Sequence, residues 1–141
     1  GEARVRVHPK SVNKLKAKLK EVTGRSNAMS MEERIIRLKQ VITGWVNYFG
    51  IAEMGRLANG LDEWLRRRIR MCYWKRWKKI KTRHDNLVKL GIDDYKAWEY
   101  ANTRKGYWRI SNSPILSKAL TNEWIKKQGF PSLTERYLLV H

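Results

Sequence analysis

Residues 30–49 read SMEERIIRLKQVITGWVNYF, and this stretch decides the fold class. Ser30 and Glu33 form a capping box, in which side chain and backbone satisfy each other's groups at the start of a helix. The apolar residues behind it recur in steps of three and four, which places them on one face of a helix that packs in a bundle. They are Ile35, Leu38, Ile42, Trp45 and Phe49.

Further helices are predicted on both sides of this one. Before it, Ser11 is the expected N-cap of a helix that ends at Gly24. After it, a third helix starts between residues 56 and 62 and runs to about residue 80. Three helices with short connections predict a small antiparallel bundle.

The remaining residues predict short helices, with a domain boundary near residue 83, where the long helices end. Residues 3–7 alternate and allow at most one short strand, which Pro9 ends. The predicted fold is therefore all-α: a three-helix bundle over residues 1–83, followed by a small domain of short helices over residues 84–141. The expected helix starts are Thr82 with Asp85, Asp93, Ser113 before Pro114, and Ser132 with Glu135.

The charge of the chain indicates its partner. There are 31 Lys and Arg against 13 Asp and Glu, a net charge of +18. So much like charge repels itself in a compact state unless a polyanion neutralises it. Seven Trp and six Tyr exclude a disordered basic tail. The composition favours a folded nucleic-acid binder over a protein of anionic membrane surfaces.

Nothing in the residues argues for an active site or a cofactor. Cys72 is the only cysteine, the three histidines are scattered, and no glycine-rich phosphate loop occurs. Asp93 and Asp94 form an adjacent pair of the kind that can hold a metal ion, but they precede a helical pattern, which favours a capping role for Asp93. We predict no catalytic residue, no metal site and no cofactor.

The strongest local signal lies between residues 64 and 83, which hold ten basic side chains and no acidic one. Basic groups pair with phosphates, and indoles offer flat surfaces to bases. The alternative is that both indoles, Trp74 and Trp77, pack under the C-terminal segment while the charges are solvated. The candidate nucleic-acid contacts are Arg66, Arg67, Arg70, Trp74, Lys75, Trp77, Lys78 and Lys81.

A second basic and aromatic cluster occupies a predicted loop at residues 104–109. The helix expected after it presents unpaired N–H groups near Ser113, which suits a phosphate. The alternative is a loop held in place by two core aromatics. The candidate contacts are Arg104, Lys105, Tyr107, Arg109 and Ser113.

Several segments in order resemble the maturase-specific region of group II intron reverse transcriptases, and the resemblance runs from about Pro9 to Tyr137. It looks most like the compact bacterial lineage. The segments are LKQVITGWVNYFGIA (38–52), RRRIR (66–70), WKRWKK (74–79), LGI (90–92), KGYWRI (105–110), SPIL (113–116) and LTNE (120–123).

The resemblance implies a thumb, also called the maturase or X domain, at residues 1–83 and a DNA-binding region at residues 84–141. It assigns RNA to the first basic cluster and DNA to the second. The implied partners are the parent intron RNA, whose splicing the protein promotes, a DNA target, and the fingers-palm polymerase domain of the same parent protein. A grip on template and primer and help with DNA integration are implied as well.

The polymerase metal motif of that family, Tyr-X-Asp-Asp, is absent, because Gly91 stands where its Tyr would precede Asp93 and Asp94. We therefore expect a non-catalytic segment of a longer RNA-directed DNA polymerase. Its expected location is the bacterial cytoplasm, at the nucleoid when bound to DNA, and not a membrane. The alternative is a stand-alone basic DNA-binding protein unrelated to introns.

Overall fold

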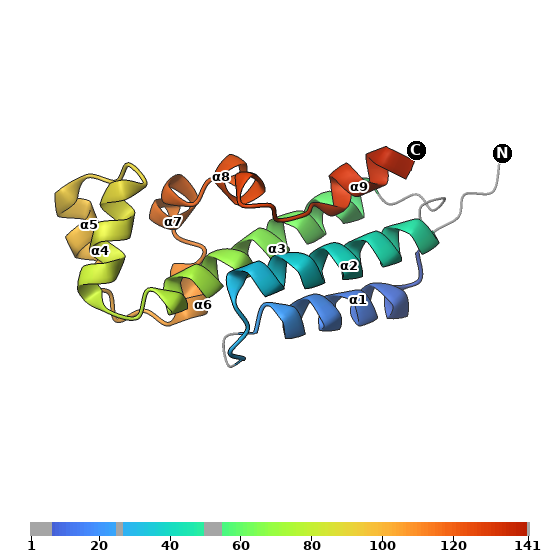
Figure 1. The fold of residues 1–141 in the computed structure, drawn as a ribbon, viewed down its shortest axis with the longest axis horizontal. Helices are drawn as coiled ribbons and strands as arrows, with labels where there is room; N and C mark the ends of the chain where they lie inside the picture. The colour runs from blue at the N-terminus through green and yellow to red at the C-terminus, as the bar shows by residue number, and fades with distance from the viewer. Residues whose placement is uncertain (1–6, 25–26, 50–54, 141) are drawn as a thin grey trace. The chain divides into compact units, whose positions relative to one another are not determined.

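The computed structural model describes residues 7–24, 27–49 and 55–140 (Figure 1). Every regular element in these ranges is a helix, which confirms the all-α fold. The strand allowed before Pro9 lies outside the described residues except for Val7, which belongs to no regular element. The helices are α1 (Pro9–Val22), α2 (Met31–Phe49), α3 (Gly55–Arg76), α4 (Ile80–Lys89), α5 (Asp94–Ala101), α6 (Tyr107–Ile110), α7 (Pro114–Ala119), α8 (Asn122–Lys127) and α9 (Leu133–Val140).

The packing divides the chain into two compact units. Unit 1 comprises residues 1–65 and 128–141, and unit 2 comprises residues 66–127. The units meet after residue 65, inside α3, and again after residue 127, whereas the sequence predicted a single boundary at residue 83. The functional division at residue 83 stays a prediction.

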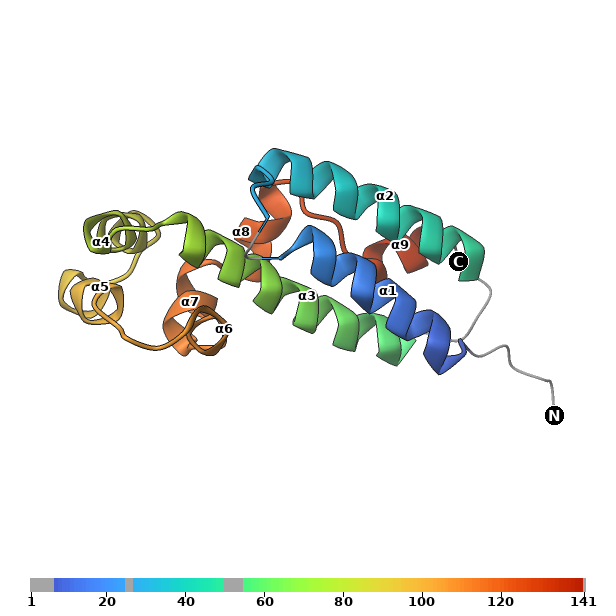
Figure 2. The same cartoon turned by 90° about the horizontal axis from the view of Figure 1, so that it is seen from below.

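In unit 1, α2 packs against both α1 and α9 (Figures 1 and 2). The buried face of α2 contains Leu38 and Ile42 as predicted, and continues to Val46. Trp45 and Phe49, the other end of the predicted stripe, are only partly buried. From Arg34 to Val46 the buried residues of α2 follow one another in steps of four.

The N-terminal caps of unit 1 are partly as predicted. The hydroxyl of Ser30 accepts a hydrogen bond from the backbone N–H of Glu33 at 3.1 Å, which confirms this helix start. Ser11 is not an N-cap. The N-cap of α1 is His8, three residues earlier, because Pro9 has a backbone angle suited to the first helical position.

Arg34 holds together the connection between α1 and α2. It is 6% exposed. Its Nη1 donates to the carbonyls of Val22 and Gly24, both at 3.2 Å, and its Nε donates to the carbonyl of Met29 at 3.1 Å. Its Nη2 reaches Oδ1 of Asn27 at 2.9 Å. One guanidinium thus satisfies carbonyls at the end of α1 and in the turn that follows.

Asp62 attaches the C-terminal helix of unit 1. It lies on α3, 4% exposed, and its carboxylate accepts the backbone N–H groups of Leu133 at 2.7 Å and Thr134 at 3.0 Å. The hydroxyl of Ser132 donates to it at 2.8 Å and accepts from the N–H of Glu135 at 3.2 Å. The predicted helix start at Ser132 is confirmed, and a negative charge from another helix stabilises it.

Unit 2 is built from the second half of α3 and from α4 to α8. The predicted third helix ends earlier than expected, at Arg76, and α4 begins at Ile80 instead of near Thr82. Gly91, with φ 98°, follows α4 as predicted, in a conformation that other residues rarely adopt.

One predicted helix of unit 2 is in fact two. From its start at Ser113, the sequence predicts one helix that Gly129 ends, but the structure breaks it at Leu120 and Thr121, between α7 and α8. The Thr121 hydroxyl accepts the N–H of Trp124 at 3.0 Å and so starts α8. The buried carbonyl of Leu120 is bonded by a side chain of α3 instead of by the next turn of helix.

Candidate nucleic-acid interface

The basic run of residues 66–83 separates into inward arginines and outward lysines. The four inward residues, all arginines, are Arg67, Arg68, Arg70 and Arg83. The other six are Arg66 and Lys75, which are partly exposed, and Arg76, Lys78, Lys79 and Lys81, which are exposed. A planar guanidinium with five donors satisfies backbone carbonyls better than an ammonium does, which accounts for this division.

Arg67 and Arg83 each combine hydrogen bonds with a stacked ring. Nη2 of Arg67 donates to the carbonyl of Trp108 at 2.7 Å, and its guanidinium carbon lies 3.6 Å from the centroid of that indole. Its Nε reaches the hydroxyl of Ser111 at 3.3 Å. Arg83 donates twice to the carbonyl of Trp74, at 3.2 and 3.1 Å, with its guanidinium carbon 4.6 Å from that ring. Both arginines therefore stabilise unit 2 through cation–π and backbone contacts.

Arg70 was a candidate RNA contact, but it is 8% exposed and faces inward. Its Nε donates to the carbonyl of Leu120 at 2.8 Å and its Nη2 to Oδ1 of Asn122 at 2.9 Å. Burial lowers the pKa of Arg70, and the charge of Arg66 lowers it further. Burial likewise lowers the pKa of Arg68. Both guanidinium groups are therefore buried in the protein instead of facing solvent, and that of Arg70 is hydrogen-bonded there.

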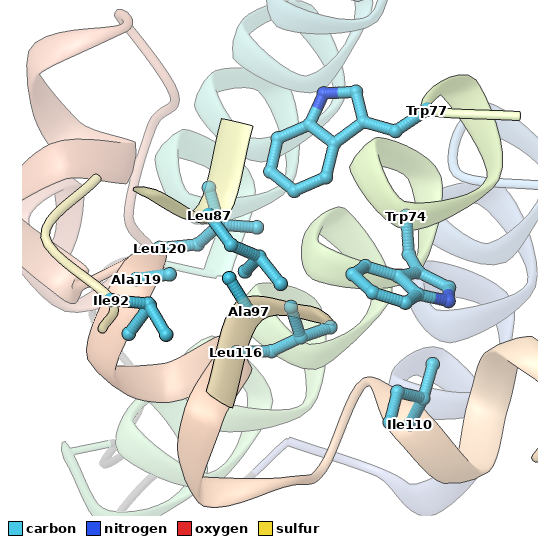
Figure 3. Close-up of a cluster of buried hydrophobic side chains, with 9 residues drawn as sticks. All are labelled: Trp74, Trp77, Leu87, Ile92, Ala97, Ile110, Leu116, Ala119 and Leu120. Carbon is cyan, nitrogen blue, oxygen red and sulfur yellow. The ribbon is translucent and has the colours of Figure 1, made fainter. Parts of the chain in front are cut away.

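Trp74 and Trp77, the two candidates for base stacking, belong to the core of unit 2 (Figure 3). Trp74 is 1% exposed and Trp77 is 9% exposed. Both indoles therefore pack under the C-terminal segment, which is the alternative that the sequence left open. Neither indole has a face available to a base. The cluster around them consists of Leu87, Ile92, Ala97, Ile110, Leu116, Ala119 and Leu120.

The outward cations form what we call the basic turn: Lys75, Arg76, Lys78 and Lys79. Lys75 is partly exposed and the other three are exposed. Among the described residues, no carboxylate pairs with any of the four. Nearby, Lys81 is exposed but pairs with Asp85 at 2.9 Å. Four adjacent cations without partners suit a polyanion.

The second cluster is a loop only in its first half: residues 104–106 belong to no helix, and a helical turn follows from Tyr107. α6 covers Tyr107 to Ile110, and Tyr107 is partly buried against the core. Arg104, Lys105 and Arg109 are exposed. The hydroxyl of Ser113 caps α7 by accepting the N–H of Leu116 at 3.3 Å, so this group is already engaged.

Sequence reasoning missed an imidazole held between two carboxylates. Nδ1 of His84 lies 2.9 Å from Asp85 and its Nε2 lies 2.7 Å from Asp94. Its ring stacks on Trp98 with centroids 3.7 Å apart. The hydrogen bond to Asp85, and after it the contact with Asp94, raises the pKa of His84, while burial acts against this. The same bond to His84, with help from Lys81, lowers the pKa of Asp85. Asp94, considered above as half of a metal-binding pair, bonds this ring across the contact between α4 and α5.

The His84 pair makes the stability of unit 2 depend on pH. Because the pKa of His84 is raised in the folded state, its bonds to the two carboxylates stabilise unit 2 fully below pH 6.5, the ordinary pKa of histidine. This stabilisation disappears as the pH rises through the pKa of His84 in the folded state. The lowered pKa of Asp85 stabilises the folded state above pH 3.8, and this contribution disappears in acid.

Urea unfolding at pH 6 and pH 9 is expected to give the lower midpoint at pH 9. In His84→Gln most of this difference should vanish, whereas His8→Gln, the matched control in unit 1, should keep it. An unchanged difference in His84→Gln would contradict the assignment.

No helix in the described ranges is both long enough and apolar enough to cross a membrane.

Comparison with protein families gives one match, and comparison with curated proteins gives none. The match is to the group II intron maturase-specific domain and covers residues 12–91. It includes most of α1 and all of α2 to α4, and with them the inward arginines and the basic turn. More than half of the chain is matched. The resemblance of the sequence to this family is therefore confirmed, and the chain belongs to the group II intron maturase-specific domain family.

Proposed function

We propose that this chain is a non-catalytic module that binds intron RNA through the basic turn and thereby promotes splicing. The observation that carries the proposal is the basic turn, whose four cations have no carboxylate partner in the described part of a chain with a net charge of +18. Each phosphate contact releases condensed counterions, so such a surface favours RNA at moderate salt. Membership of an intron maturase family supports intron RNA as the ligand.

Further roles follow from the parent proteins of this family. In our proposal the module acts beside a fingers-palm polymerase domain of the same parent protein, and unit 1 helps to grip template and primer. Arg104, Lys105 and Arg109, which are exposed, contact the DNA target during integration. The domain order of the parent proteins, in which a DNA-binding region follows the thumb, is the reason for assigning DNA to them. The second candidate, a stand-alone basic DNA-binding protein, would use the same cations but have no preference for intron RNA.

The test replaces Lys75, Lys78 and Lys79 together by alanine. Each lost phosphate contact should reduce the slope of log K against log salt by roughly 0.7 to 0.9, so the slope should fall by about 2. Affinity for intron RNA near physiological salt should fall roughly 10- to 100-fold. Fluorescence anisotropy at several salt concentrations measures both, and circular dichroism checks the fold.

A matched control removes the same charge elsewhere in unit 2. Lys89, Lys118 and Lys127 are exposed, lie outside the basic turn and are replaced by alanine together. The control variant should keep most of the wild-type slope of log K against log salt. Equal losses in the two triple variants would show that only net charge matters and would refute the basic turn as the interface. Equal affinity of the wild type for intron RNA and for duplex DNA would favour the second candidate.

A further inference from the structure

A groove of about 590 Å³ lies between α1 and α2 in unit 1. Its two walls differ in chemistry. α1 contributes Lys14 and Lys18, and α2 contributes the aromatic residues Trp45, Tyr48 and Phe49. The volume falls in the range of sites that hold small molecules. None of these residues belongs to the basic turn.

The basic wall can contact anions. Lys14 and Lys18 are exposed and stand four residues apart, on the same face of α1. Within the described part of the chain neither has a carboxylate partner. Two unpaired cations in a groove favour an anionic occupant over the apolar face of a partner helix, which would leave their charges desolvated.

The aromatic wall offers an accessible ring. Tyr48 is 80% exposed, and its ring meets Phe49 edge to face with centroids 4.7 Å apart. Phe49 in turn lies 5.0 Å from Trp45. Tyr48 is therefore held by a neighbouring ring while its surface stays open. The core indoles Trp74 and Trp77 have no such exposed ring surface.

Two details of α2 indicate that the groove is adapted to an occupant. Gly44 lines it, in mid-helix, where glycine is unfavourable. A Cβ at this position would meet nothing within 4 Å, so the packing of the protein does not require glycine. The indole N–H of Trp45 is buried and has no hydrogen-bond partner among the described residues.

We propose that this groove binds one unpaired nucleotide of an RNA, with its base on Tyr48 and its flanking phosphates at Lys14 and Lys18. Unpaired bases in RNA stack on aromatic side chains, whereas paired bases are not available to do so. The acceptor atoms of a base or sugar would satisfy the N–H of Trp45. This inference rests on the proposed function, because it assumes that the chain binds RNA.

The experiment compares two RNA hairpins that differ at one position. One carries a single bulged nucleotide, and the other carries an abasic sugar there. Base–aromatic stacking should make the unmodified 141-residue chain bind the first hairpin roughly tenfold more tightly than the second. In Tyr48→Ala this ratio should fall to about one. Tyr48→Phe keeps the ring and should keep the ratio.

Two control variants separate this site from the rest of the protein. Tyr95→Ala removes a comparably exposed tyrosine, 74% accessible, from α5 and should keep the ratio. The triple variant of the basic turn should weaken binding of both hairpins equally and leave their ratio unchanged.

The possible failures are distinguishable. A ratio of one in the wild type, with salt-dependent RNA binding intact, would refute the nucleotide site and leave the proposed function standing. Absence of RNA binding would refute both. A dimer in light scattering that Tyr48→Ala converts to a monomer would assign the groove to a second copy of the chain and overturn the proposal.

Discussion

Replacing Arg34 by alanine is expected to lower the free energy of unfolding of unit 1 by about 4 kcal/mol. The guanidinium is 6% exposed and satisfies three carbonyls and one side-chain amide oxygen. Its removal takes this donor from one buried carbonyl and two partly buried ones, and each buried group left unsatisfied costs about 1–3 kcal/mol. The measurement is urea unfolding, with the change read from the midpoint.

Two further variants make the Arg34 test specific. Arg34→Lys keeps the charge but cannot form the same set of bonds, so it should recover less than half of the loss. Arg37→Ala, one turn away, removes a half-exposed arginine whose bond to Glu33 is 3.7 Å long. It should change the free energy by less than about 0.5 kcal/mol. Similar losses in Arg34→Ala and Arg37→Ala would contradict the structural role of Arg34.

Replacing Arg70 by alanine is expected to destabilise unit 2 by about 3 kcal/mol without changing the salt dependence of RNA binding. The buried carbonyl of Leu120 and the amide of Asn122 lose their donor. Loss of the side-chain stem removes packing as well. At low temperature, where the variant stays folded, its slope of log K against log salt should equal that of the wild type.

The control for Arg70 is Arg76→Ala, which removes an exposed arginine from the same helix. We expect the reverse outcome: little change in stability and a slope lower by nearly 1. If Arg70→Ala instead lowers the slope while unfolding is unaffected, the residue faces the nucleic acid and the inward assignment is wrong.

Three helix starts were predictable from the sequence because their signals are local, whereas the starts expected at Ser11 and Thr82 were wrong. Ser30, Ser113 and Ser132 each accept a backbone N–H three residues further on, as their spacing indicates. The break between α7 and α8 was not predictable in this way. It involves a bond between Arg70 and Leu120, which are fifty residues apart in sequence.

The candidate interface was predictable in composition but not in detail. Ten basic residues between 64 and 83 indicated a polyanion partner, and the family match supports that direction. Helical spacing alone could not tell which of them face inward, because the face with Trp74 is covered by residues from α4 to α7. A usable signal was the segregation of residue types, with arginine predominating before residue 74 and lysine predominating after it.

The contact between Asp62 and the start of α9 has a consequence for the order of folding. The two partners are about seventy residues apart, and all of unit 2 lies between them. On the ribosome, where the chain emerges from its N-terminus, unit 2 can complete its core while Asp62 still lacks its three donors. Unit 1 closes only when residues 128–141 have emerged. A nascent chain paused before them would expose the unfinished core of unit 1 beside an already folded unit 2.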